Sequence, residues 1–203
     1  MILLSAKEVI AIFRKAISDY HLQDHVNASL TNPFDQNSIE GLLYVKTWID
    51  TVQWHLEDII RRDDISNEEF ILTKRKIDAS NQNRTDKVEE IDELFLQFFS
   101  KLEIREDSKL NSETPGWLLD RLSILELKIY HFIEQAERED ADVDHRNKAA
   151  NKLKVLLEQE HDLSVCFNEL MLDLTDGKKY MKTYKQMKMY NDPSLNPELY
   201  KKN

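Results

Sequence analysis

The chain has 203 residues, of which 41% are hydrophobic and 33% charged, and its formal net charge is −10 at pH 7. This composition suits one domain, or two small ones, with a sizeable apolar core. Only three glycines and four prolines are present. A sheet protein needs more turn residues than this, and the glycines do not form a phosphate-binding or dinucleotide-binding loop. We therefore predict an all-α protein.

The single cysteine and the apolar segments bear on location. Cys166 has no partner for an internal disulfide, which favours a reducing compartment, and its apolar helical surroundings predict a buried, inert thiol. The N-terminal residues lack the apolar region of a signal peptide, and no apolar stretch approaches the length of a membrane span. We predict a cytoplasmic protein without a transmembrane segment.

The first half of the chain predicts three long helices. Ser5, Asn37 and Ser66 are each followed three residues later by a glutamate, which is the capping-box pattern of a helix start. The second helix carries an apolar heptad seam formed by Leu42, Val45, Ile49, Val52, Leu56 and Ile59. The third runs past Leu102 without glycine or proline, and the charged, aperiodic residues 103–113 predict a loop.

Two more helices and a basic tail follow. Thr114-Pro115 combines a cap residue with proline at the first helical position, and Gly177 is a natural helix stop. We place a helical bundle domain at residues 1–177 and a tail rich in Lys, Tyr and Met at 178–203. From Gly177 onward the chain holds seven lysines and two acidic residues, whereas the remainder has a balance of −15.

This charge distribution argues against a nucleic-acid surface on the acidic body. The tail either docks back on that body, which we favour, or binds an anionic partner such as a membrane surface, a phosphorylated glycan precursor or nucleic acid.

A faint repeat accompanies the heptads. At an offset of 76 residues His55 falls on His131, and Leu42-Leu43 falls on Leu118-Leu119. Either two helical hairpins are copies of one another, or heptad composition alone produces the matches. With or without that relation, we expect an antiparallel bundle of about five long helices.

The third helix carries polar side chains where an apolar seam is expected. Its seam, extended from both ends, includes Lys74, Asn81 and Arg84, and the stripe beside it contains Asp78 and Gln82. A buried cation without a partner is costly, so such residues are normally paired or hydrogen-bonded. The sequence therefore predicts a polar layer inside the bundle.

Two neighbouring helices offer partners for this layer: Trp54, Glu57, Asp58 and Arg61 on the second helix, and Asp120, Arg121 and Lys128 on the fourth. One interpretation is a structural layer that sets helix register, with solvated outer faces. The other is a binding site for a small anionic ligand, either phosphorylated or resembling a sugar nucleotide. The face that carries Trp54 also fits a homodimer interface.

Four segments resemble the bacterial domain-of-unknown-function family DUF4254. They run from Trp54 to Arg61, from Lys74 through Asp86 to Asp92, from Thr114 to Leu125, and from Gly177 to Pro193. The resemblance covers nearly the whole chain and implies an α-helical bacterial protein without an established activity. It also implies an association with cell-envelope glycan and lipopolysaccharide biosynthesis.

A second, weaker likeness suggests a magnesium site. Glu57-Asp58-x-x-Arg61 and Glu89-x-x-Asp92 look similar to the acidic motifs with which all-α nucleoside triphosphate pyrophosphohydrolases hold Mg²⁺, although Arg61 stands where the third acid belongs. The resemblance makes Glu57, Asp58, Glu89 and Asp92 candidate metal ligands and catalytic residues.

Other metal centres find less support in the sequence. A di-iron bundle needs two Glu-x-x-His motifs, and only one is present. The six histidines and one cysteine show no zinc-type spacing. A purely structural or protein-interaction scaffold is the remaining alternative.

Overall fold

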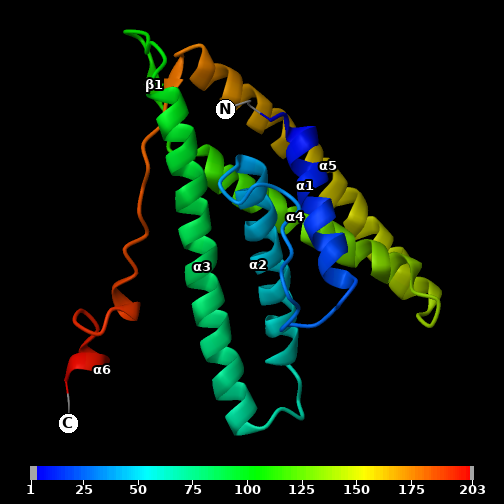
Figure 1. Cartoon of the computed structure of the whole chain (residues 1–203). Coiled ribbons are helices and arrows are strands. Elements are labelled where there is room, and N and C mark those ends of the chain that lie inside the picture. The colour runs from blue at the N-terminus through cyan, green and yellow to red at the C-terminus, as the bar shows by residue number, and fades with distance from the viewer. Residues whose placement is uncertain (1–3, 202–203) are drawn as a thin grey trace.

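The computed structural model describes residues 4–201, which form five long helices and almost no strand (Figure 1). The helices are α1 (Ala6–His21), α2 (Ile39–Ile59), α3 (Asn67–Phe99), α4 (Pro115–Glu137) and α5 (Val143–Thr175). The short elements are β1 (Lys109–Leu110), β2 (Lys179–Tyr180), the 3₁₀ turn η1 (Met189–Asn191) and α6 (Pro197–Tyr200). The prediction of an all-α bundle is confirmed.

Most helix starts follow the expected capping chemistry. The side-chain oxygens of Ser5, Ser66 and Thr114 accept backbone N–H groups at the starts of α1, α3 and α4, as predicted. The start of α2 differs by one residue, because Ser38 rather than Asn37 caps it. Both residue types cap well, so the pattern alone did not distinguish them.

The apolar core lies where α1, α2, α4 and α5 meet, and the C-terminal half of α3 packs onto it. Its buried members include Phe13, Leu43, Trp48, Ile91, Phe95, Leu118, Leu122, Phe167 and Leu174. The outer face of α5 stays in solvent and carries Cys166, whose thiol is exposed rather than buried as expected. Within residues 4–201, no helix is long and apolar enough to span a membrane.

The tail docks on the body along α3, as we favoured (Figure 1). α5 ends at Thr175, and Gly177, just beyond its cap residue, has a φ of +67°, which suits glycine. β2 then pairs in parallel with β1 from the expected loop 103–113, a two-residue ladder that the sequence did not predict. Beyond it, the Gln186 backbone N–H donates to Glu89 Oε1 at 3.0 Å, and Lys188 Nζ donates to Thr85 Oγ1 at 2.7 Å.

A buried carboxyl links α1 to α4 and predicts a pH effect. Arg14 Nε donates to Glu126 Oε2 at 2.7 Å, and Glu126 is only 1% exposed. Burial raises the pKa of Glu126 to about 7, although the Arg14 guanidinium opposes the rise. A carboxyl whose pKa is raised on folding stabilises the fold below its unfolded pKa, and this contribution disappears as the pH rises through the folded pKa.

The free energy of unfolding should therefore fall between pH 5 and pH 8, with Glu126 accounting for at most about 3 kcal/mol. Urea unfolding of the Glu126→Gln variant at both pH values should show a smaller fall in the free energy of unfolding than wild type shows. The control, Glu90→Gln, removes a carboxylate that pairs with Lys87 at the surface. An unchanged fall in Glu126→Gln would contradict the assignment.

Candidate functional site

A pocket of about 340 Å³ opens between α2, α3 and α4. Its wall combines an indole, two aliphatic side chains, an amide and five charged groups. The lining residues are Asp50, Gln53, Trp54, Glu57, Asp58, Arg61, Arg84, Ile124 and Leu127. Such a mixture of apolar wall and a few convergent polar groups is typical of small-molecule sites.

A buried ion-pair network continues from the pocket through Asp50 and Arg84. On α2, Lys46 Nζ donates to Asp50 Oδ2 at 2.7 Å, and it lies 2.7 Å from Asp120 Oδ1 on α4. The Ser123 hydroxyl accepts from Lys46 and donates to Asp50 Oδ2 at 2.8 Å. From α3, Arg84 Nε lies 3.8 Å from Asp120 Oδ1. Two cations and two carboxylates thus meet from three helices with no net charge.

Burial dominates the electrostatics of this network. It raises the pKa of Asp50, an effect that Lys46 opposes and the neighbouring Asp120 carboxylate reinforces. Within residues 4–201, Asp50 Oδ1 and Arg84 Nε are buried and lack a hydrogen-bond partner. Buried polar atoms rarely stay unpaired. Both residues also line the pocket, so the network is continuous with its wall.

The predicted polar layer therefore exists, with partly different members. Arg84 and Asp120 belong to it, whereas we did not single out Lys46, Asp50 or Ser123. A signal was available, because Lys46 and Asp50 lie four residues apart inside an apolar helical run. A charged pair at that spacing in a buried segment marks the network better than the broken seam of α3 does.

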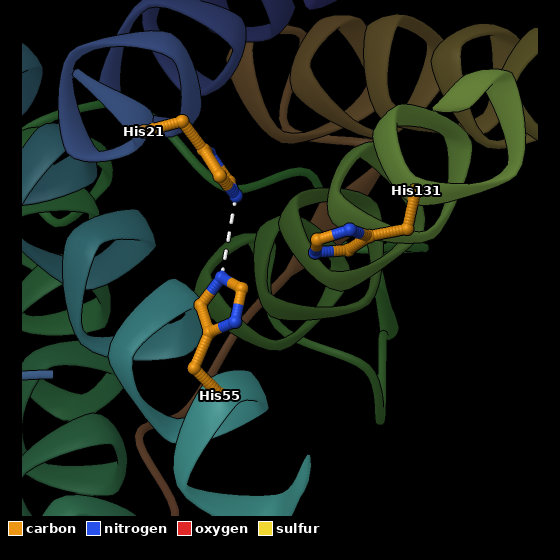
Figure 2. A group of neighbouring side chains, drawn as sticks. All are labelled: His21, His55 and His131. Atoms are coloured by element: carbon orange, nitrogen blue, oxygen red, sulfur yellow. Dashed lines mark hydrogen bonds between the residues drawn. The ribbon is translucent and has the colours of Figure 1, made fainter. Parts of the chain in front are cut away.

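Three histidines from separate helices form a group (Figure 2). His21 is the last residue of α1, His55 comes from α2 and His131 from α4, and their rings point into one shared space. One nitrogen from each ring lies within 4.8 Å of the other two. The Nε2 atoms of His21 and His55 are 3.2 Å apart. The spacing of the histidines along the chain gave no sign of this gathering, because the three residues belong to three separate helices.

Each histidine ring is stacked on a different aromatic side chain. His21 stacks on Tyr130 with ring centroids 4.3 Å apart, and His55 stacks on Tyr20 at 5.3 Å. His131 stacks on Trp54 at 4.9 Å with an interplanar angle of 12°. The rings are therefore held in place by packing.

The pocket and the three histidines share walls. Trp54 lines the pocket and stacks on His131. Asp58 lines the pocket too, and its Oδ2 is 3.8 Å from His55 Nδ1. On the face of α2 that carries Trp54, the indole packs against His131 of α4, and the other side chains of that face line the pocket.

Of the other sequence-predicted site residues, some lie in the pocket and some lie elsewhere. Trp54, Glu57, Asp58 and Arg61 line the pocket with Arg84, and the Arg61 guanidinium is hydrogen-bonded to the Glu57 carboxylate. Asn81 and Gln82 contact the tail instead: Asn81 O accepts from Lys188 Nζ at 3.1 Å, and Gln82 Oε1 accepts from Asn191 at 3.1 Å.

Four expected cations and carboxylates lie outside both the layer and the pocket. Lys74 and Asp78 form an ion pair with side chains 52% and 55% exposed, because the buried positions of this part of α3 are those of Thr73, Ile77 and Ser80. Ile77 keeps its expected place, but the buried positions on either side of it are Thr73 and Ser80 rather than Lys74 and Asn81. Arg121 pairs with Glu113 at 2.7 Å and lines, with Lys128, a different groove beside α5.

The structure does not bring the four proposed magnesium ligands together. Ser80 Oγ donates to Gln53 Oε1 at 3.3 Å, which puts those two residues level on α3 and α2. Glu89 and Asp92 then lie roughly 20 Å along the helices from Glu57 and Asp58, at 1.5 Å per residue. Asp92, on α3, is buried against the start of α4, and its Oδ1 accepts the Gly116 N–H at 2.7 Å.

The model of the family described as "Protein of unknown function (DUF4254)" matches residues 40–183, most of the chain. The chain belongs to the DUF4254 family. Comparison with curated proteins and with solved structures returns no match. The region matched to DUF4254 contains every residue that lines the pocket as well as His55 and His131, whereas His21 precedes it.

Proposed function

We propose that this protein binds a small anionic ligand, phosphorylated or resembling a sugar nucleotide, in the pocket between α2, α3 and α4. The observation that carries the proposal is Arg84. Its side chain is 24% exposed and lines the pocket, and within residues 4–201 its guanidinium has one ion pair, the 3.8 Å approach of Nε to Asp120 Oδ1. A guanidinium with free N–H groups fits a phosphate or carboxylate in two-pronged geometry.

The remaining wall suits the rest of such a molecule. The Trp54 indole, with Ile124 and Leu127, offers apolar surface for the face of a sugar ring or a base. The carboxylates of Asp50 and Asp58 accept hydrogen bonds from hydroxyl or amino groups. Together these groups favour a ligand with an anionic end and a hydroxyl-rich or heterocyclic body.

As part of the same proposal, the protein has an accessory role in the assembly of envelope glycans, because the precursors of these glycans carry phosphate and sugar on one molecule. A cytoplasmic location and a homodimer stay predictions alongside it. The enzyme alternative, a Mg²⁺-dependent pyrophosphohydrolase, loses support from the separation of its four carboxylates, and the magnesium arm of the experiment below addresses it directly.

Thermal unfolding with UDP-glucose, UDP and glucose 1-phosphate, each with and without Mg²⁺, tests the binding proposal. A ligand present at 100 times its Kd stabilises the fold by about 2.7 kcal/mol. For a chain of this size that raises Tm by roughly 5–10 °C. In Arg84→Gln the shift should shrink, because losing a charged hydrogen bond costs about 1.5–3 kcal/mol, or roughly 10–100-fold in Kd.

The matched control is Arg121→Gln, which removes a guanidinium that is paired at the surface outside the pocket. It should leave the ligand-induced shift unchanged. Absence of a shift with all three compounds, or an equal loss in both variants, would count against an anion site at Arg84. A shift that requires Mg²⁺ and disappears in Glu57→Gln would favour the enzyme alternative instead.

A further inference from the structure

We propose that His21, His55 and His131 form a binding site for a divalent transition-metal ion, with zinc the best-fitting candidate. This site goes beyond the anion-binding pocket and stands without it. The three rings come from three different helices and point into one space (Figure 2). Three imidazoles at one point are a recurrent ligand set for zinc, and they leave a fourth position open.

The distances fit such an ion. Zinc bound by histidine has Zn–N distances of about 2.0–2.1 Å, so two nitrogens on a tetrahedral ion lie about 3.3 Å apart. The Nε2 atoms of His21 and His55 are already 3.2 Å apart. All three ligand nitrogens lie within 4.8 Å of one another, so a small movement of His131 would complete the set.

Hydrogen bonds at the opposite nitrogens prepare two of the rings for a metal. His21 Nδ1 lies 2.7 Å from the carbonyl oxygen of Ile17, which accepts only, so Nδ1 carries the proton. His131 Nδ1 lies 2.8 Å from Glu134 Oε2 and is protonated for the same reason. In the neutral rings both Nε2 atoms then present lone pairs. A hydrogen bond from Nδ1 to a carbonyl or carboxylate is the usual arrangement behind a metal-bound histidine.

The His55 ring has a carboxylate behind it as well, but at a longer distance. His55 Nδ1 faces Asp58 Oδ2 at 3.8 Å, which leaves its Nε2 beside that of His21.

A metal-free explanation accounts for only part of this geometry. His55 Nε2–H can donate to His21 Nε2, which satisfies that pair. His131 Nε2 stays buried without a hydrogen-bond partner in the described part of the chain. A buried acceptor without a partner costs free energy. A cation between the three rings gives every Nε2 lone pair a partner.

The surroundings match a site that exchanges its fourth ligand. Asp24, on the exposed loop after α1, has Oδ1 3.9 Å from His55 Nε2, and its side chain is 64% exposed. Trp54 and Asp58 connect the three histidines to the pocket. The open position of the metal is therefore available to water or to the Asp24 carboxylate, close to where the anionic ligand would lie.

Metal titration of the purified full-length chain tests the proposal without any ligand. After chelation and dialysis, the protein should bind one equivalent of Zn²⁺ by calorimetry. Co²⁺ should give the intense visible absorption of a four- or five-coordinate ion. His131→Gln and His55→Gln should each weaken Zn²⁺ binding at least 100-fold. The control, His161→Gln, replaces an exposed histidine on α5 and should bind as wild type does.

Circular dichroism of the metal-free variants tests whether they remain folded, and we expect the helical spectrum of wild type. As a second measurement, Zn²⁺ should raise Tm in wild type and in His161→Gln, but not in His131→Gln. The proposal is overturned if binding is substoichiometric, if Co²⁺ gives only the weak spectrum of a six-coordinate ion, or if a folded double variant, His55→Gln with His131→Gln, binds Zn²⁺ as wild type does. None of these readouts depends on the anion-binding pocket, so failure of either proposal leaves the other standing.

Discussion

Replacing Lys46 by methionine should destabilise the protein by about 3–5 kcal/mol, since breaking a buried ion pair leaves uncompensated charge. Lys46 is 1% exposed and lies between the carboxylates of Asp50 and Asp120. Without the ammonium group these two buried aspartates repel each other, and Ser123 loses its lysine partner. Urea unfolding at pH 7 measures the change.

A lysine in an exposed ion pair provides the matched control. Lys74→Met disrupts a pair of the same i,i+4 spacing on α3, with Asp78 as partner. That change should cost no more than about 0.5 kcal/mol, the usual value of an exposed helical pair. If Lys46→Met lowers the free energy of unfolding no more than Lys74→Met does, Lys46 does not form a buried ion-pair network with Asp50 and Asp120.

The same network separates a structural layer from a functional one. Replacing Lys46, Asp50 and Asp120 together by methionine and leucines removes three of the four charges and leaves Arg84, whose side chain is partly exposed to the pocket. Such replacement of buried ionic groups is often neutral or stabilising. A stable triple variant that still gives the ligand-induced shift would assign the layer to helix register alone. A stable variant that has lost the shift would assign it to the site.

Gly116→Ala should cost about 3 kcal/mol or more, because the start of α4 has no room for a side chain. A Cβ at this position would lie 2.6 Å from Asp92 Oδ1 and 2.9 Å from the carbonyl oxygen of Val88. Relieving the clash breaks the hydrogen bonds that Asp92 accepts from the Gly116 N–H and the Thr114 hydroxyl. Overpacking and loss of charged hydrogen bonds each cost about 1–3 kcal/mol.

A double-mutant cycle checks this account. Asp92→Ala removes the carboxylate with which the new methyl group would collide, so Gly116→Ala should be less costly in that background than in wild type. Additive effects would show that the clash with Asp92 is not the cause. The experiment also distinguishes the roles proposed for Asp92: a capping carboxylate affects unfolding, whereas a magnesium ligand affects Mg²⁺-dependent binding.

The fold class and most helix starts could be predicted from the sequence, because they depend on residues that are close to one another in the chain. Cap residues such as Ser5 and Thr114 act on the N–H groups of their own first turn, so a short pattern is enough to place them. Heptad periodicity likewise reports which face is apolar. In a long helix the pattern assigns individual inward-facing residues less reliably, because an error of one residue rotates the assigned face by about 100°. That is why Lys74 was expected inside and lies outside.

Arg84 was recognisable as an inward polar group, since it interrupts the apolar seam of α3, and Asp120 was predicted as a partner for that layer on the fourth helix. Lys46 was harder to find: its spacing from Asp50 marks a charged pair inside an apolar run, but that spacing alone does not show that the pair is buried. Its burial depends on α4 placing Asp120 and Ser123 opposite it. No local pattern contains that information.

The sequence by itself therefore determined an all-α bundle of five long helices, most of their caps, a polar layer and a basic tail. Only the tertiary structure decided which polar groups meet. His21 and His55 are 34 positions apart in sequence, and His131 lies still further along the chain. Metal-binding spacings are recognisable when ligands share one turn or one helix. Here the three rings converge because three separate helices pack against one another, and packing depends on contacts between segments remote in sequence.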